Sequence, residues 1–160
     1  MKQLVGIAEQ IAAKLIARKE TIAVAESSAG GLIAASLLAV PGASAYFLGG
    51  AVVYTRDARR VLTDISDDGM KGFRSSSEPY AKLLAERMRE RFGCDWGLSE
   101  TGAAGPTGNR YGDAAGHSCM AIAGPAVEVM TLETGSNDRF TNMQRFAATA
   151  LQLLLRNLER

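Results

Sequence analysis

Apolar residues at the two ends of the chain recur with the spacing of amphipathic helices. Near the N-terminus they return every three or four positions and share one helical stripe, made by Leu4, Ile7, Ala8, Ile11, Ala12, Leu15 and Ile16. This spacing predicts a first helix over residues 2–18 with one face to bury. A comparable pattern predicts a long closing helix over residues 139–155, with Phe146, Ala150, Leu153 and Leu154 facing inward.

Three further helices are predicted between these ends. They cover residues 30–39, 55–62 and 78–92. Pro41-Gly42 cannot continue a helix and stops the first of them, whereas Glu78-Pro79 is typical of a helix start and opens the last. The second is short and charged, and the polar stretch 63–76 that follows it is predicted to be a loop.

Five strands are expected between the helices. They cover residues 21–25, 47–54, 95–101, 117–123 and 127–132. The last two form a hairpin, because Gly124-Pro125 between them is a turn signal. Apolar and polar residues alternate poorly over 47–54, which favours a strand covered on both faces.

The order of these elements predicts an α/β fold, a three-layer α/β/α sandwich on a mixed, mostly parallel sheet. Such folds place their sites beyond the C-terminal ends of the strands. Two glycine-rich loops, 26–31 and 101–108, each follow a predicted strand. We therefore expect both loops at one edge of the sheet, where they can build a single site.

Composition narrows the classes of function. The 160 residues suit one domain spanning 1–160, and the formal net charge of +1 gives no reason to expect direct contact with nucleic acid. Cys94, Cys119 and His117 are too few for a disulfide framework or a metal centre, so we expect no metal and a reducing, cytoplasmic setting. No apolar run reaches the roughly 18 residues of a membrane span.

The first glycine-rich loop has the geometry of a strand that stops and restarts as a helix. N–H groups at such a helix start, with the hydroxyls of Ser27 and Ser28, can hold an anion or a carbonyl oxygen. Ser27 is a candidate nucleophile or oxyanion donor, although the local sequence favours an N-cap, the commonest role of a serine before a helix. Glu26 would orient a substrate hydroxyl or bond nearby backbone amides. Gly30 and Gly31 let a ligand or another backbone approach closely.

The second glycine-rich loop, TGAAGPTG, matches no nucleotide-binding motif by its spacing. Thr101 at its start would bond substrate or cap the turn, and the backbone of Gly102 and Gly105 would take part in substrate binding. His117 is interpreted as a hydrogen-bonded structural residue. The arginines of RDARR fit a solvated helix face as well as a site.

Five blocks together resemble one known family. AESSAGG, PGASAYFLGGAVVYTRDARR, SSSEP, SETGAAGPTG and NDRF follow in the order and spacing of ESCTGG, PGSSxxFxxGxVxYSNxxK, GAVSE, TGIAGPxGG and GDR. These are motifs of the C-terminal domain of CinA, the competence/damage-inducible protein family. The resemblance covers nearly the whole chain.

The resemblance implies an amidohydrolase similar to nicotinamide-nucleotide amidase, which converts nicotinamide mononucleotide to nicotinic acid mononucleotide and ammonia without a metal or cofactor. By position, Ser27 would attack the amide carbon. Tyr54, Thr101 and Arg139 would complete the site, with Arg59 at the position of the family lysine. The implied partner is a small-molecule mononucleotide, and alanine- and leucine-rich helix faces favour a homo-oligomer.

Arg59 departs from the family in a way that changes the chemistry. A desolvated lysine can be neutral near pH 7 and accept the serine proton, whereas a guanidinium stays charged. Lys71 and Lys82 are the nearest lysines in sequence and match no motif. Arg56 replaces the asparagine of YSN, so the site gains a second guanidinium group that favours anions.

Three hypotheses follow from these residues. The first is an amidohydrolase acting on a pyridine mononucleotide or a similar amide. The second is a non-catalytic or altered-specificity binder of a phosphorylated small molecule. The third, suggested by the family name, is an interaction module in DNA uptake or damage response, against which the near-neutral charge argues.

Overall fold

The computed structural model describes all residues from 1 to 160. In chain order the elements are α1 (Lys2–Arg18), β1 (Ile22–Glu26), α2 (Leu32–Leu38), the short 3-10 helix η1 (Ala43–Ala45), β2 (Phe47–Val52), α3 (Arg56–Thr63), the short 3-10 helix η2 (Asp68–Met70), α4 (Glu78–Phe92), β3 (Trp96–Ala103), β4 (His117–Ala123), β5 (Glu128–Glu133) and α5 (Arg139–Leu158). The predicted α/β class is confirmed.

The five strands form one mixed sheet in the order β2-β1-β3-β4-β5. β1 is parallel to β2 and β3, whereas β4 is antiparallel to both β3 and β5. Four strands therefore run in one direction and β4 runs against them. Because Ala103 at the end of β3 pairs with His117 at the start of β4, these two residues lie at the edge where β1 also ends.

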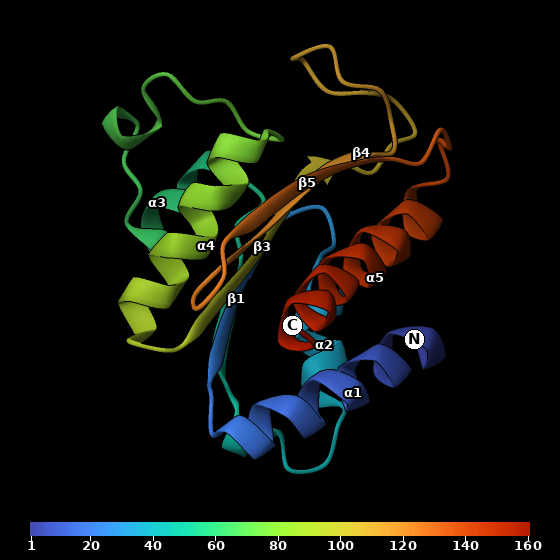
Figure 1. The fold of residues 1–160 in the computed structure, drawn as a ribbon. Helices are drawn as coiled ribbons and strands as arrows, with labels where there is room; N and C mark the ends of the chain where they lie inside the picture. The colour runs from blue at the N-terminus through green and yellow to red at the C-terminus, as the bar shows by residue number, and fades with distance from the viewer.

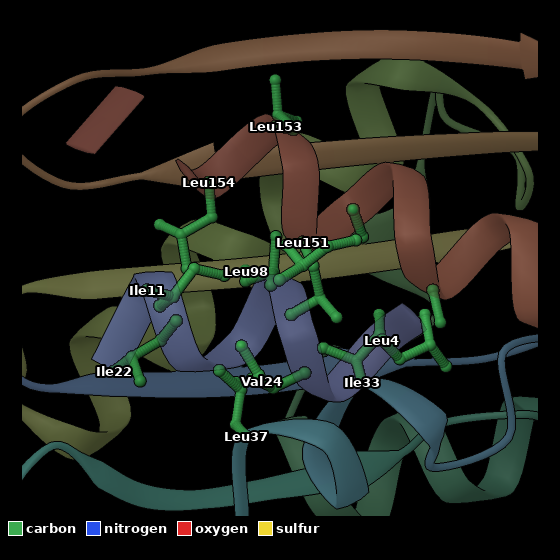
Figure 2. Close-up of a cluster of buried hydrophobic side chains, with 14 of the residues drawn as sticks. Leu4, Ile11, Ile22, Val24, Ile33, Leu37, Leu98, Leu151, Leu153 and Leu154 are labelled. Atoms are coloured by element: carbon green, nitrogen blue, oxygen red, sulfur yellow. The ribbon is translucent and has the colours of Figure 1, made fainter. Parts of the chain in front are cut away.

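Helices cover both faces of the sheet, as the three-layer prediction requires. α1, α2 and α5 lie on one face, and α3 and α4 lie on the other (Figure 1). The core under α1, α2 and α5 is aliphatic, and Figure 2 shows part of it: Leu4, Ile11, Ile22, Val24, Ile33, Leu37, Leu98, Leu151, Leu153 and Leu154. Each of these side chains is almost fully buried, and burial of one such side chain stabilises the fold by about 1.5–3 kcal/mol.

On the other face, small residues let α4 lie close to the sheet. A side chain at Gly97 of β3 would place its Cβ only 1.9 Å from the carbonyl oxygen of Ala85 in α4. Ala81, Ala85, Cys119 and Ala121 form a buried cluster between this helix and the strands. α4 therefore packs directly on β3 and β4.

The structure corrects the prediction for the second strand, β2. The segment 47–54 is not covered on both faces, because β2 is an edge strand whose residues alternate between exposed and partly buried. It also ends at Val52, which leaves Tyr54 in the loop that leads to α3. The poor alternation comes from Gly49 and Gly50: at both positions a Cβ would contact a neighbouring group at 2.9–3.0 Å.

The alanine- and leucine-rich helix faces are largely used inside this structure. Ile33, Leu37, Leu151 and Leu154 pack in the core instead of lying on the surface. The observation that favoured a homo-oligomer is thereby accounted for within one chain, and the homo-oligomer stays a prediction. No helix here combines the length and the apolar character needed to cross a lipid bilayer.

Candidate functional site

A cavity of about 750 Å³ lies where β1 and β3 end, which is the edge predicted for the site. Its volume is in the range of pockets that take small molecules. Its lining comes from the ends of β1 and β3, from α3 and α4, and from the loops that follow β2, α3 and β3. It consists of Ser27, Val53, Tyr54, Thr55, Arg56, Arg59, Asp67, Met70, Phe73, Arg74, Ser75, Ser76, Tyr80, Thr101, Gly102, Asn109, Arg110 and Tyr111.

Four residues singled out in the sequence share this cavity. Ser27, Tyr54, Arg59 and Thr101 all line it, although they come from four separate segments of the chain. Arg139 does not line it but lies beside it. One guanidinium nitrogen of Arg139 donates to the Tyr54 hydroxyl at 3.2 Å, and another donates to the carbonyl of Gly105.

The turn that carries Ser27 is held by Glu100, a residue of β3 that is fully buried. One carboxylate oxygen accepts the backbone N–H groups of Ser27 at 3.0 Å and Ala29 at 2.8 Å. The other accepts the hydroxyls of Ser28 and, at 3.1 Å, Ser118. Burial raises the pKa of the Glu100 carboxyl, which these hydrogen bonds oppose. Sequence analysis missed Glu100. The available signal was a single acidic residue within a strand that is otherwise made of residues suited to burial.

Glu26 holds the start of α2, the helix that follows this loop. Its two carboxylate oxygens accept the N–H groups of Ile33 at 3.0 Å and Ala34 at 2.9 Å. Of the two roles considered for Glu26, bonding to nearby amides is therefore the one observed. Burial raises the pKa of this carboxyl as well.

These contacts correct the expectation that the start of α2 holds an anion. The N–H groups of Ile33 and Ala34 already donate to Glu26, and that of Leu32 donates to the Ala29 carbonyl at 3.2 Å. Ser28 does not line the cavity either, because its hydroxyl donates to Glu100. Internal carboxylates thus occupy the donors that a ligand would have used.

The glycines of the two loops mainly permit close packing. A Cβ at Gly30 would lie 2.8 Å from Cε of Met143 in α5, and one at Gly105 would lie 3.0 Å from the Asn137 carbonyl oxygen. Gly30, Gly31 and Gly105 do not line the cavity, whereas Gly102 does. Even at Gly102, a Cβ would lie 2.5 Å from the His117 carbonyl oxygen.

Arg59 is fixed in the cavity wall and is only 6% exposed. Its Nε donates to the carbonyl of Ile65 at 3.0 Å, and its terminal nitrogen contacts Asp67 at 2.5 Å. The solvated-face interpretation of RDARR is thus wrong for Arg59. It fits Arg60, whose guanidinium is half exposed and pairs with Asp57.

The cavity lining contains neither a lysine nor a histidine. Lys71 and Lys82 are exposed and lie outside it, and Lys82 pairs with Glu86 at 3.7 Å. Burial raises the pKa of the Tyr80 phenol to about 12, so this lining hydroxyl stays protonated at neutral pH. No lining group therefore takes the place of the neutral amine that would accept a proton from Ser27.

Two loops that sequence analysis left unassigned complete the lining. Arg74 makes a two-point contact with Asp113, at 2.7 and 3.1 Å. The ring of Tyr111 faces two guanidinium groups, those of Arg74 at 5.3 Å and Arg110 at 5.1 Å from its centroid. Arginine stacked on tyrosine is favourable through the charge distribution of the ring. The only available signal was the cluster of arginines and tyrosine in segments predicted to be loops.

Ser76 connects Thr101 to His117. The N–H of Ser76 donates to the Thr101 hydroxyl at 3.1 Å, and its carbonyl accepts from Nε2 of His117 at 2.7 Å. Ser76 has a φ of 58°, a conformation that costs a serine free energy unless its surroundings fix it. His117 is therefore a hydrogen-bonded structural residue, as predicted, and it fixes a segment of the cavity wall.

Replacing Glu100 by leucine tests its hold on the Ser27 turn. The N–H groups of Ser27 and Ala29 would lose their acceptor, so the free energy of unfolding should fall by at least about 2 kcal/mol. Glutamine is the matched control: its amide oxygen can accept both N–H groups while its NH2 donates to the serine hydroxyls. We expect Glu100→Gln to stay within about 1 kcal/mol of the wild type in denaturant unfolding. Equal stability of the two variants would contradict this assignment.

The stability contributed by His117 should depend on pH. Burial lowers its pKa, but contacts with Glu133, Ser76 and Asp113 outweigh this and raise the pKa above its ordinary value. The protonated ring therefore stabilises the fold below about pH 6.5, and this contribution is lost as pH rises through the raised pKa.

Denaturant unfolding of the wild type and His117→Gln, measured from about pH 5 to about pH 8, checks this sign. The wild type should be more stable than the variant by an amount that shrinks as pH rises. A difference that grows with pH would show that the folded protein favours the neutral ring.

The chain is similar in sequence to known proteins. The family model described as CinA C-terminal domain matches residues 5–158. A CinA-like protein from Chlorobium limicola is 38% identical over 150 residues, covering 90% of this chain and 35% of that protein. A CinA-like protein from Anaeromyxobacter sp. is 36% identical over 146 residues, covering 91% of this chain and 36% of that protein. The chain thus spans about a third of the length of these curated relatives.

Solved structures agree with the sequence relatives. The competence damage-inducible protein A (ComA) from Klebsiella pneumoniae has a TM-score of 0.91 at 25% identity, with 98% of each chain covered. The competence/damage inducible protein CihA from Agrobacterium tumefaciens has a TM-score of 0.90 at 26% identity, covering 99% of this chain and 96% of that one. The resemblance inferred from five sequence blocks is confirmed, and the chain belongs to the CinA C-terminal domain family.

Proposed function

We propose that the cavity binds a phosphorylated small molecule of the mononucleotide class. The observation that carries this proposal is the charge of the lining, in which four arginines face a single carboxylate, that of Asp67. Guanidinium groups stay protonated at neutral pH and offer paired N–H donors that match the oxygens of a phosphate. A cavity lined in this way favours anionic ligands over neutral ones.

Two of the four guanidinium groups are free to meet a ligand. Arg59 pairs with Asp67, and Arg74 pairs with Asp113. Arg56 and Arg110 also line the cavity and have no carboxylate partner. Unpaired guanidinium groups at the wall of a cavity leave N–H donors that a phosphate can satisfy.

Hydrolysis of an amide is the second candidate. Its support is that Ser27, Tyr54 and Thr101 line one cavity, as a serine nucleophile with hydroxyl partners requires. Arg59 argues against efficient turnover, because its guanidinium is bonded to Ile65 and Asp67 and cannot accept a proton. We therefore propose binding as the main function and expect the wild-type protein to hydrolyse nicotinamide mononucleotide slowly at most.

Binding is tested with nicotinamide mononucleotide, using nicotinamide riboside as the ligand without phosphate. The mononucleotide should bind at least about tenfold more tightly, because only it engages the guanidinium groups. Arg56→Ala should weaken its binding about tenfold, measured by titration calorimetry. Arg91→Ala is the matched control, because Arg91 is exposed on α4 and lies outside the cavity lining. Equal affinity for the two ligands, or no binding of either, would overturn the proposal.

Hydrolysis is tested by restoring an amine at position 59. Because the carboxylate of Asp67 would hold a lysine in its charged form, Arg59→Lys is combined with Asp67→Asn. A general base contributes about 10²- to 10⁴-fold, so ammonia release should rise at least about a hundredfold over the wild type. Adding Ser27→Ala should abolish the gain. Rapid turnover by the wild type that Ser27→Ala removes would instead make the protein an amidohydrolase as it stands.

A further inference from the structure

The arginines of the cavity come in two groups on separate parts of the chain. Arg56 and Arg59 belong to the start of α3, beside Asp67. Arg74 and Arg110 belong to the loops before α4 and after β3, and the former pairs with Asp113. Each group thus has one arginine fixed by a carboxylate and one arginine without such a partner.

The two groups are electrostatically distinct. The pKa of Asp67 is lowered mainly by its hydrogen bond with Arg59 and also by the charges of Arg56 and Arg60. Asp113, in contrast, interacts with Arg74, Asn109 and His117. The ion pairs are separate as well: Asp67 pairs with Arg59 and Arg60, whereas Asp113 pairs with Arg74.

Tyr80 lines the cavity together with both groups. Its buried phenol is affected by the charge of Arg59 and by Tyr111, which belongs to the second group. Tyr80, Arg59 and Tyr111 all line the same cavity. The groups are therefore two sets of ion-paired arginines in the wall of one cavity.

In the second group a carboxylate holds Arg74, whereas Arg110 has no carboxylate partner. Arg74 is fixed by two hydrogen bonds to Asp113, which also accepts from Asn109 at 2.8 Å. The Tyr111 ring lies against both guanidinium groups, and its hydroxyl accepts from Arg110 at 3.1 Å. Burial opposes ionisation of this phenol, but the hydrogen bonds from Arg110 and Ser75 lower its pKa below the ordinary value. Arg74 and Arg110 carry two positive charges against the single carboxylate of Asp113, so excess positive charge remains at this group for a second anion.

From this arrangement we infer that the cavity takes a small molecule with two separate phosphate groups, one held by Arg56 and Arg59 and the other by Arg110 and Arg74. This inference rests on the proposed function and specifies its ligand class. A single phosphate satisfies one group and leaves the other without an anion. A ligand that carries two phosphates on opposite sides of a sugar satisfies both, and the Tyr111 ring lies beside the second.

The test compares an adenosine bisphosphate, with one phosphate on each side of the ribose, with the two adenosine monophosphates that each carry one of them and with adenosine. The bisphosphate should bind at least about tenfold more tightly than the better monophosphate. Arg110→Ala should remove this gain while at least one monophosphate keeps its affinity, because the group on α3 is unchanged. Arg56→Ala should also remove the gain, and Arg91→Ala, a change at an exposed position outside the cavity lining, should leave every affinity unchanged.

The possible failures are distinguishable. If monophosphates bind better than adenosine but the bisphosphate binds no more tightly, the second phosphate site is wrong and the proposed function stands. If no phosphorylated ligand binds better than adenosine, both fail. Arg110 is exposed, so its truncation leaves no buried gap, and we expect wild type and Arg110→Ala to have equal melting temperatures. Equal melting temperatures would verify that weaker binding of the bisphosphate comes from the lost side chain and not from a less stable fold.

Discussion

A carboxylate without exposure to water holds the turn on which Ser27 lies. Burying such a group is unfavourable unless hydrogen bonds compensate, and Glu100 has four, two from backbone N–H groups and two from hydroxyls. Because β3 lies next to β1 in the sheet, the acid on one strand reaches the loop that follows the other. The position of the Ser27 side chain at the cavity wall thus depends on strand order, and on a single side chain 73 residues further along the chain.

The hydrogen bonds that Glu26 and Glu100 accept also limit which groups of the protein can bind a ligand. Glu26 and Glu100 occupy the N–H groups around the start of α2, which removes them from ligand binding. Positive charge for a ligand is then supplied by arginine side chains from α3 and two loops. Guanidinium groups bind phosphate well and cannot take a proton from a serine. A family scaffold with an arginine in place of the lysine is therefore better suited to holding an anion than to deprotonating an alcohol.

Ser76 shows how the loops are attached to this scaffold. Its backbone bonds Thr101 on β3 on one side and His117 on β4 on the other, so a loop residue with positive φ is bound to two strands. The adjacent Arg74 is fixed through Asp113, which lies in the loop just before β4. The loop of residues 73–76, which lines the cavity, is thereby held along the edge of the sheet, although it is neither helix nor strand.

The sequence alone determined the helices, the strands, their layering and the family, because periodic burial and ordered motifs are local properties of the chain. It also selected Ser27, Tyr54, Arg59 and Thr101, which the structure brings to one cavity. Only the tertiary structure decided that β2 is an edge strand and that Glu26 and Glu100 occupy the donors of the first loop. It alone placed Arg74, Arg110 and Tyr111 in the wall of the same cavity as Arg59. The physical reason is that hydrogen bonds and ion pairs between segments far apart in the chain depend on strand order and loop path, which no local spacing of residues encodes.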